Sequence, residues 1–222
     1  MEGPFVKLAM PLVLGSRSPR RVELLASVGV PVIGRPCDVD ESPLPEEEPR
    51  AYVERIVLAK LRAALQGAQQ RPDGRHAVLV ADTTVTIDGH ILGKPEDGLE
   101  AAAMLTRLAG RSHEVLTCYG LAVTGSSAAD PGLSGAAEDR VVRTVATRVT
   151  MRALSAAEIG RYVASGEPFG KAGAYAIQGL GALLIERIDG SYSGVVGLPL
   201  CEVAADLARL GVAESGDREQ GP

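Results

Sequence analysis

Two short apolar segments, at residues 84–87 and 90–92, flank the dipeptide Asp88-Gly89, and this arrangement limits the folds open to the chain. Asp-Gly between apolar runs is a strong signal for a tight hairpin turn, because both residues tolerate the backbone conformation that the turn requires. Elsewhere, strand-like and helix-like segments alternate along the sequence, which is typical of the α/β class. Since a hairpin adds an antiparallel pair to a parallel arrangement, the sequence predicts an α/β fold with a mixed sheet.

The remaining elements follow from hydrophobic periodicity and from residues that begin or end helices. Pro19 after Ser18 is typical of a helix start, and so are the spacings at residues 97–100 and 155–158. We expect strands at residues 12–14, 30–33, 77–80, 84–87, 90–92, 115–123, 141–151 and 182–188. We expect helices at residues 19–28, 50–66, 97–109, 155–165 and 200–210.

The chain is long enough for one domain with a sizeable core. It has 222 residues, of which 45% are apolar and 3% aromatic, so Val, Leu, Ile and Ala must supply most of that core. We expect residues 1–212 to form a single domain of two lobes around a cleft, and residues 213–222 to form a flexible tail. Residues 124–139, rich in Ser, Ala, Gly and Asp, are expected to form a mobile surface loop.

Charge and cysteine content argue against several classes of protein. A net charge of −5 is unlike that of a general nucleic-acid binder, although a local group of Arg and Lys can still hold a small phosphate. Cys37, Cys118 and Cys201 are scattered without metal-type spacing, which favours reduced thiols. Since no long apolar run is present and residues 1–14 are better explained as a first strand than as a signal peptide, we expect a cytoplasmic protein without a membrane span.

The first candidate binding segment is SRSPRR at residues 16–21, between a predicted strand and a predicted helix. Arg20 and Arg21 would lie in the first helical turn, where a positive charge is unfavourable because the helix N-terminus is already positive. The pair makes physical sense if an anion binds there, together with free backbone N–H groups and the hydroxyls of Ser16 and Ser18. Two solvated arginines on a helix face are the alternative.

Lys60 is the second candidate, because it falls in the middle of the apolar arc of the predicted helix at residues 50–66. Arg55 and Arg62 lie on the other side of the helical wheel, as surface charges should. A lysine that faces the core needs an anionic partner or a route by which its ammonium reaches solvent. The sequence leaves both explanations open.

The buried-type strand at residues 77–80 runs into Asp82, and α/β folds often carry functional residues at such strand ends. Asp82 could bind Mg²⁺ or orient a water molecule, since metal sites for phosphates use one or two carboxylates with oxygens of the ligand. An Asp that caps a turn is the alternative. Lys94, in a Gly-Lys-Pro segment, and Gln178, in the glycine-rich segment 171–179, are further candidates that could also belong to ordinary loops.

Other catalytic signatures are not evident in the sequence. His76, His90 and His113 do not cluster, and we expect each to be structural or solvated. No Ser-His-Asp arrangement stands out, and neither a Walker loop nor a dinucleotide-binding fingerprint is present.

Taken together and in this order, these segments resemble the Maf family of nucleotide pyrophosphatases over roughly residues 12–210. The resemblance implies an elongated α/β fold, similar to the inosine triphosphatases, in which helices flank a mixed sheet with a central cleft. It also implies a cytoplasmic and often dimeric protein. The matching segments are SRSPRRVELL at 16–25, LAK at 58–60, ADT at 81–83, GKP at 93–95, GRSHEV at 110–115, KAGAYAIQG at 171–179 and GLPL at 197–200.

The resemblance also implies a role for each candidate residue. Glu41, next to Asp40 in an acidic loop, would join Asp82 around Mg²⁺ or Mn²⁺ and a water molecule, with Asp82 as the general base. The residues that would hold the phosphates and complete the site are Ser16, Arg20, Arg21, Lys60, Lys94 and Gln178.

Two further segments bear on the substrate. KAGAYAIQG followed by GSYSGVVGLPL is similar to the branch of the family that acts on dTTP and UTP with release of pyrophosphate. Gly194 stands where an Asn is common, and the loop at residues 124–139 is longer than expected, so base preference or subunit contacts could differ. Two alternatives stay open: an inosine or xanthosine triphosphate pyrophosphatase, and a nucleotide-binding regulator of septum formation without turnover.

Overall fold

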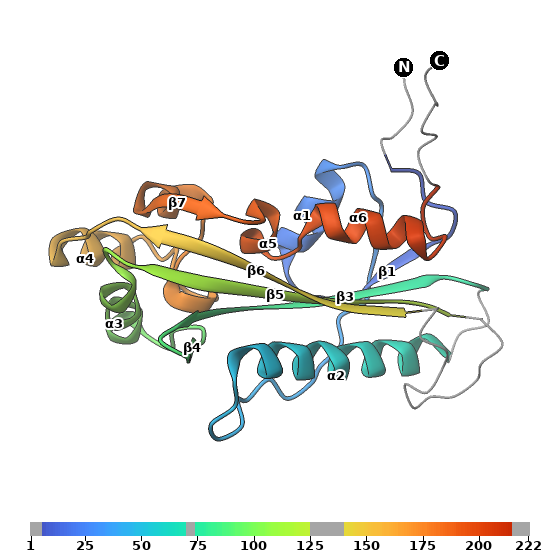
Figure 1. Cartoon of the computed structure of the whole chain (residues 1–222), viewed down its shortest axis with the longest axis horizontal. Helices are drawn as coiled ribbons and strands as arrows, with labels where there is room; N and C mark the ends of the chain where they lie inside the picture. Colours follow the sequence, from blue (N-terminus) through green and yellow to red (C-terminus); the bar gives the residue numbers. More distant parts are fainter. Residues whose placement is uncertain (1–5, 70–73, 125–139, 215–222) are drawn as a thin grey trace, which may run out of the picture.

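A long mixed sheet runs through the molecule, and helices cover both of its faces (Figure 1). The structure is a computed structural model that describes residues 6–69, 74–124 and 140–214. Figure 1 shows a molecule that is elongated along β3, β5 and β6, with α2 on one face of these strands and α1 and α6 on the other. The strands are β1 (Leu12–Leu14), β2 (Ile33–Gly34), β3 (Ala77–Ile87), β4 (His90–Leu92), β5 (Ser112–Val123), β6 (Arg140–Met151) and β7 (Ile185–Asp189). The helices are α1 (Pro19–Ser27), α2 (Pro49–Gln69), α3 (Gly98–Leu108), α4 (Ala156–Ala164), α5 (Tyr192–Val196) and α6 (Leu200–Arg209), with 3₁₀ turns η2 (Ala172–Ala174) and η3 (Gly179–Leu184).

The strands of the described residues form one sheet in the order β2-β1-β3-β5-β6-β7, with β4 paired to β3. β1 pairs in parallel with β2 and β3, whereas the other pairings are antiparallel. The predicted hairpin joins β3 to β4, and Asp88 and Gly89 adopt the positive φ angles of 53° and 75° that suit such a turn. The predicted α/β class with a mixed sheet is therefore confirmed.

β1 and β4 lie along the same edge of β3 and leave a gap between them. β1 pairs with residues 77–79 and β4 pairs with residues 85–87, whereas β5 pairs with the opposite edge from residue 77 to residue 86. Among the described residues, no strand therefore lies beside residues 80–84 on the first edge. This gap interrupts the sheet near its middle and makes room for a cavity.

Side chains of β3 alternate between the two faces of the sheet, as they do in any strand. Val78 and Val80 pack in a hydrophobic cluster with α2, whereas Leu79 packs with α1 and α6 on the other face. By the same alternation, Asp82 lies on the α2 side and Thr83 on the α1 side. A third cluster lies at the far end of the sheet, where α3, α4 and η2 cover the first half of β5.

The predicted boundaries of β3 and β2 are wrong. The segments at residues 77–80 and 84–87 belong to one continuous strand, because the Thr- and Val-rich residues 83–86 have high strand propensity and pair with β5. Asp82 therefore lies within a strand and not at its end. The strand predicted at residues 30–33 is reduced to Ile33–Gly34, because Pro31 has no N–H for a ladder hydrogen bond.

The C-terminal third also departs from the prediction in two places. Residues 182–184 belong to the 3₁₀ turn η3, and β7 begins only at Ile185. In η3, a side chain at Gly181 would overlap the Ala176 carbonyl oxygen, because its Cβ would lie 2.0 Å away. The short helix α5 was not predicted, since five residues with a central Gly carry little helical signal.

Both ends of the described chain meet at one place. Leu8 and Ala213 form an antiparallel bridge, and the Glu214 amide donates to the Lys7 carbonyl at 2.8 Å. The rest of the predicted tail, from residue 215, and residues 125–139 of the predicted loop lie outside the described residues. All three cysteines are unpaired, as predicted. Among the residues described, none of the helices combines the length and the apolar character needed to span a bilayer.

Candidate functional site

A cavity of about 570 Å³, here named the outer cavity, opens at the gap in the edge of β3. The start of α1, the loop before α2, α2 itself, β3 and residues 169–171 all contribute to its wall. Of the predicted site residues, Gln178 is missing from this wall. The others line it together: Ser16, Arg20, Arg21, Glu41, Lys60, Asp82 and Lys94.

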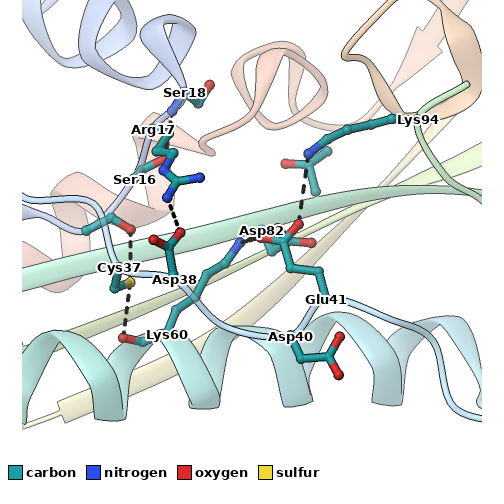
Figure 2. A network of polar contacts seen from close by, with 12 residues as sticks. Ser16, Arg17, Ser18, Cys37, Asp38, Asp40, Glu41, Lys60, Asp82 and Lys94 are labelled. Carbon is teal, nitrogen blue, oxygen red and sulfur yellow. Dashed lines mark hydrogen bonds and ion pairs between the residues drawn. The ribbon is translucent and has the colours of Figure 1, made fainter. Parts of the chain in front are cut away.

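The buried ammonium of Lys60 holds two carboxylates in the outer cavity. Its Nζ lies 2.7 Å from Asp82 Oδ1 and 2.7 Å from Glu41 Oε1. Figure 2 shows Lys60 reaching from α2 to both carboxylates. The lysine on the apolar face of the helix therefore has anionic partners, and this decides between the two explanations that the sequence left open.

Contacts with α2 position Glu41. The hydroxyl of Tyr52 donates to the Glu41 carbonyl at 2.9 Å, and Arg55 donates to the Ser42 carbonyl at 3.0 Å, so the acidic loop is tied to the helix. Asp40 turns away from Lys60 (Figure 2), and its carboxylate accepts from the Ser42 amide at 2.9 Å. Glu41, and not its neighbour, therefore faces Asp82.

The electrostatics of this end of the cavity favour the ionised form of Glu41. Burial pushes the pKa of Glu41 upward, but the hydrogen bond and charge of Lys60, helped by Lys94 and Arg21, outweigh it and leave that pKa below its usual value. Burial, together with the charges of Asp82 and Glu41, raises the pKa of Tyr52 to about 12. The Tyr52 hydroxyl therefore keeps its proton and remains a donor to the loop.

Arg21 is buried and acts as a brace between elements. Its Nε donates to the Gly197 carbonyl at 2.7 Å, one Nη donates to Ser16 Oγ at 3.0 Å, and the other donates to Thr83 Oγ1 at 3.2 Å. Burial lowers its pKa from the usual range, which the charge of Asp82 partly offsets. Ser16 Oγ also accepts from the Ser18 amide at 3.2 Å, so its own O–H is left to donate to a ligand.

Three other cationic side chains lie along the cavity with fewer protein partners. Arg20 has a buried Nε that finds no hydrogen-bond partner within the described part of the chain. Lys94 is mostly exposed, and its Nζ lies 3.9 Å from Glu41 Oε2. Lys171 donates to the Glu167 carbonyl, and burial, together with the charge of Arg20, lowers its pKa. An anion between these side chains would offset their mutual repulsion and supply the partner that Arg20 lacks.

A smaller cavity of about 70 Å³, here named the inner cavity, adjoins the outer one. Arg20, Lys94 and Lys171 line both cavities, so they stand at the junction. The structure places Gln178 in the inner cavity with Thr83 and Tyr175, against the apolar side chains Val85, Val115, Ile177, Val195 and Val196. The site is therefore a charged chamber connected to a smaller, largely apolar one.

Several lining residues escaped sequence reasoning. Lys171 begins the KAGAYAIQG segment, and Thr83 directly follows Asp82. Their positions in these motifs could have identified both as residues of the site. Arg17 and Asp38 line the outer cavity and form an exposed ion pair (Figure 2). No sequence signal joins these two residues, because their pairing depends on how the loop before α2 folds back toward α1.

Asp82 and Glu41 are suited to hold a divalent cation together with a ligand. Each has an oxygen 2.7 Å from the same ammonium nitrogen, so the two carboxylates converge on one place. Within the described residues, no group of three or more His, Cys, Asp and Glu side chains forms a complete metal site. Mg²⁺ is commonly bound by one or two carboxylates plus phosphate oxygens and water, so this donor set fits such a cation.

Comparisons with known proteins agree with the motifs. A family model described as "Maf-like protein" matches residues 11–210. A protein of Nitrosomonas europaea named dTTP/UTP pyrophosphatase is 45% identical over 210 residues, which is 91% of this chain and 95% of that protein. A protein of Methylobacillus flagellatus with the same name is 47% identical over 208 residues, covering 94% and 96%.

Among solved structures, a nucleoside-triphosphatase (dITP/XTP pyrophosphatase) from Mycobacterium abscessus aligns with a TM-score of 0.38 and 16% identity. The alignment covers 64% of this chain and 74% of that one. A likeness at this level adds nothing to what the sheet order already shows.

Proposed function

Because this chain belongs to the Maf family, we propose that it hydrolyses nucleoside triphosphates to a nucleoside monophosphate and pyrophosphate, with dTTP and UTP as its preferred substrates. One observation carries the proposal. Two converging carboxylates, Asp82 and Glu41, share a cavity with cationic side chains that have spare hydrogen-bonding capacity. Such a cavity can bind a polyanion at one side and a water molecule at the other.

In this proposal, Asp82 is the catalytic base that takes a proton from the water attacking the α-phosphorus. Lys60 holds Asp82 and Glu41 in place through its two contacts of 2.7 Å. Arg20, Lys94 and Lys171 offset the charge that grows on the leaving pyrophosphate, and such electrostatic stabilisation is usually the largest catalytic contribution.

Arg21 and Ser16 have a related role at the start of α1. Arg21 keeps Ser16 in position, and the Ser16 O–H and the N-terminus of α1 then bind phosphate oxygens. In this proposal, Arg21 and Lys60 hold other side chains in position, and the remaining cationic side chains bind phosphate.

Asp82 and Glu41, together with substrate oxygens, would hold Mg²⁺ or Mn²⁺, which supplies further neutralisation of phosphate charge when bound. The observation that supports this is that Lys60 contacts one oxygen of each carboxylate, Asp82 Oδ1 and Glu41 Oε1, which leaves the second oxygen of each for a cation beside the ammonium.

We place the nucleobase in the inner cavity. It is much the smaller of the two cavities, which suits a single ring better than a fused purine. Gln178 has an amide donor and an amide acceptor to offer the edge of the ring. This size favours a pyrimidine nucleotide over inosine or xanthosine triphosphate.

Product analysis tests the proposal. The purified chain is incubated with dTTP or UTP and Mg²⁺ or Mn²⁺ in ¹⁸O-labelled water, and the products are identified by mass. The expected products are pyrophosphate and a monophosphate that carries the label, because attack at the α-phosphorus puts the water oxygen there. Release of inorganic phosphate alone would contradict the proposal. Faster turnover of ITP or XTP would favour the purine alternative, and nucleotide binding without turnover in Mn²⁺ would favour a regulator of septum formation.

We also propose that residues 1–212 form one domain of two lobes, and that the protein is a cytoplasmic homodimer that does not bind nucleic acid. The separate hydrophobic clusters at the two ends of the sheet support the lobes, and the net charge of −5 argues against nucleic acid. Analytical ultracentrifugation of the full chain checks the dimer, because a single species at the monomer mass of 23.1 kDa would exclude it.

A further inference from the structure

A chain of hydrogen bonds connects a buried guanidinium to a helix carbonyl behind the inner cavity. Arg21 donates to Thr83 Oγ1 at 3.2 Å, Thr83 Oγ1 and Thr117 Oγ1 are 2.9 Å apart, and Thr117 donates to the Gly194 carbonyl at 2.7 Å. Thr83 and Thr117 are directly paired across β3 and β5, so their side chains share one face of the sheet. These hydrogen bonds therefore link α1, β3, β5 and α5.

The groups at the two ends of this series of hydrogen bonds determine the direction of every hydrogen bond in it. A guanidinium can only donate, and a carbonyl can only accept. Thr117 has one hydroxyl proton, and it is used on the Gly194 carbonyl. The link between the threonines must then use the proton of Thr83, so Thr83 both accepts from Arg21 and donates to Thr117.

Thr83 is left with the capacity to accept one more hydrogen bond and with no proton to give. It lines the inner cavity, whereas Thr117 is 1% exposed and does not line either cavity. A ring N–H placed against Thr83 would be bound, and a ring nitrogen with a lone pair would be repelled. Uracil and thymine have an N–H at N3, and cytosine has a lone pair at the same position.

We propose that Thr117 is a positioning residue that keeps the Thr83 hydroxyl an acceptor, so that the inner cavity favours uracil and thymine over cytosine. The inference rests on the proposed function for the placement of the base, and it adds to it the group that determines the discrimination among pyrimidines. Thr117 acts only through Thr83, because a buried hydroxyl bonded to Thr83 and Gly194 does not reach a ligand.

The test compares kcat/KM for UTP and CTP in the wild type and in Thr117→Val, which keeps the side-chain shape but removes the hydroxyl. In this variant the Thr83 proton becomes free to point at a ring nitrogen. The expected result is a fall in the UTP/CTP preference on the order of tenfold, with kcat/KM for CTP rising. A general loss of stability does not produce this result, because it lowers both values together.

Matched variants isolate the role of the hydroxyl. Thr117→Ser keeps the hydroxyl and should keep the preference. Thr147→Val is the control, since Thr147 is equally buried and bonds Ser191 at the start of α5, yet it does not contact Thr83. Thr83→Val should itself lower the preference, and adding Thr117→Val to it should change nothing further.

Each outcome decides the proposal. An unchanged UTP/CTP ratio in Thr117→Val, or an equal change in Thr147→Val, overturns it. A wild type that hydrolyses UTP and CTP equally well also overturns it, and leaves the pyrophosphatase activity standing.

If no nucleotide is hydrolysed, the proposed function fails alone, and the binding constants of UMP and CMP for the same variants test the inference. If Thr117→Val does not fold, N3-methylated UTP tests the wild type, and turnover equal to that of UTP overturns the inference.

Discussion

At the scale of single residues, the protein places a buried cation between two anions. The Lys60 ammonium contacts Asp82 and Glu41 at once, so two close ion pairs offset the cost of burying its charge. Because there is one ammonium for two carboxylates, removal of Lys60 leaves two negative charges close together without a cation between them. Substitutions here should therefore change chemistry and pH dependence more than they change shape.

The first prediction concerns Asp82. Asp82→Asn keeps the size of the side chain but removes the proposed base, so kcat for UTP should fall on the order of a hundredfold or more. Asp40→Asn is the matched control, because Asp40 is exposed and faces away from the site. Steady-state kinetics with pyrophosphate detection measure both variants. Near-normal turnover in Asp82→Asn would remove Asp82 from the role of base.

A second prediction follows from the charge of Lys60. Lys60→Met leaves Asp82 and Glu41 facing each other, so the pKa of Glu41 should rise, because the group that lowers it is gone. Activity that needs ionised carboxylates should then be lost at a higher pH, with the acid limb of kcat/KM moving up by about one pH unit. Arg62→Met, on the exposed side of the same helix, should leave the limb in place. An acid limb that does not move in Lys60→Met would contradict the role given to its charge.

A third prediction concerns His113, which is buried and hydrogen-bonded to the Tyr175 hydroxyl at 2.7 Å. His90, which is exposed, serves as the comparison. Burial lowers the pKa of His113 from 6.5 to about 4. Because the unfolded chain binds this proton more readily, stability is complete above pH 6.5 and falls as the pH drops toward 4. The free energy of unfolding should decrease by about 2 kcal/mol from this group between pH 7 and pH 5.

Urea unfolding of His113→Gln should show a smaller loss between the same two pH values, and His90→Gln should behave like the wild type. Equal losses in all three proteins would mean that folding does not lower the pKa of His113.

At the scale of elements, β3 supplies the site because its partners on one edge are short. A second long strand on that edge would pair with residues 80–84 and close the outer cavity. The turn after β1 is correspondingly tight, since a Cβ at Gly15 would lie 2.8 Å from Val80 Cγ1. The end of β1 can therefore approach β3 and carry Ser16 to the cavity.

A fourth prediction tests this close approach. Gly15→Ala should push the end of β1 away from Val80, lower the free energy of unfolding by about 1–3 kcal/mol and raise KM for UTP, because Ser16 moves with it. Gly34→Ala is the control, since a Cβ there meets nothing within 4 Å. Urea unfolding and steady-state kinetics measure the two effects. An unchanged KM in a destabilised Gly15→Ala would show that the turn does not position Ser16 for substrate binding.

At the scale of the whole molecule, the charges around the cavity oppose the net charge of the chain. The protein is acidic overall, yet Arg20, Lys94 and Lys171 gather at the junction of the two cavities. A bound nucleotide would join elements from both ends of the sheet, since α1 and residues 170–178 contribute to one site. Binding should therefore stabilise the molecule as a whole.

The fifth prediction is a thermal shift. A non-hydrolysable UTP analogue with Mg²⁺ at a hundred times its Kd should stabilise the folded protein by about 2.7 kcal/mol and raise Tm. Arg20→Gln should lose most of this shift, because it lacks the guanidinium whose Nε has no partner in the part of the protein that the structure describes and is expected to contact the phosphate. The Tm of Asp82→Asn should still rise when the analogue is added without Mg²⁺. A full shift in Arg20→Gln would show that the nucleotide binds elsewhere.

Features that depend on neighbours in the chain were predictable from the sequence. The hairpin at Asp88-Gly89, the start of α1, the capped starts of α3 and α4 and the position of Lys60 on the apolar arc of α2 all follow from local backbone and periodicity rules. With the motif resemblance, these rules also identified seven of the residues that line the outer cavity.

Only the tertiary structure decided how those residues are arranged. Asp82 lies within a strand, Gln178 lines a separate chamber, Lys171 and Thr83 join the site, and Arg21 is a brace. Each of these depends on which strands pair along the edge of β3 and on hydrogen bonds between residues far apart in the chain. Hydrophobic periodicity predicts which face of a helix or strand is buried, but it does not predict which other element covers that face. The pairing of the strands is therefore known only from the folded structure.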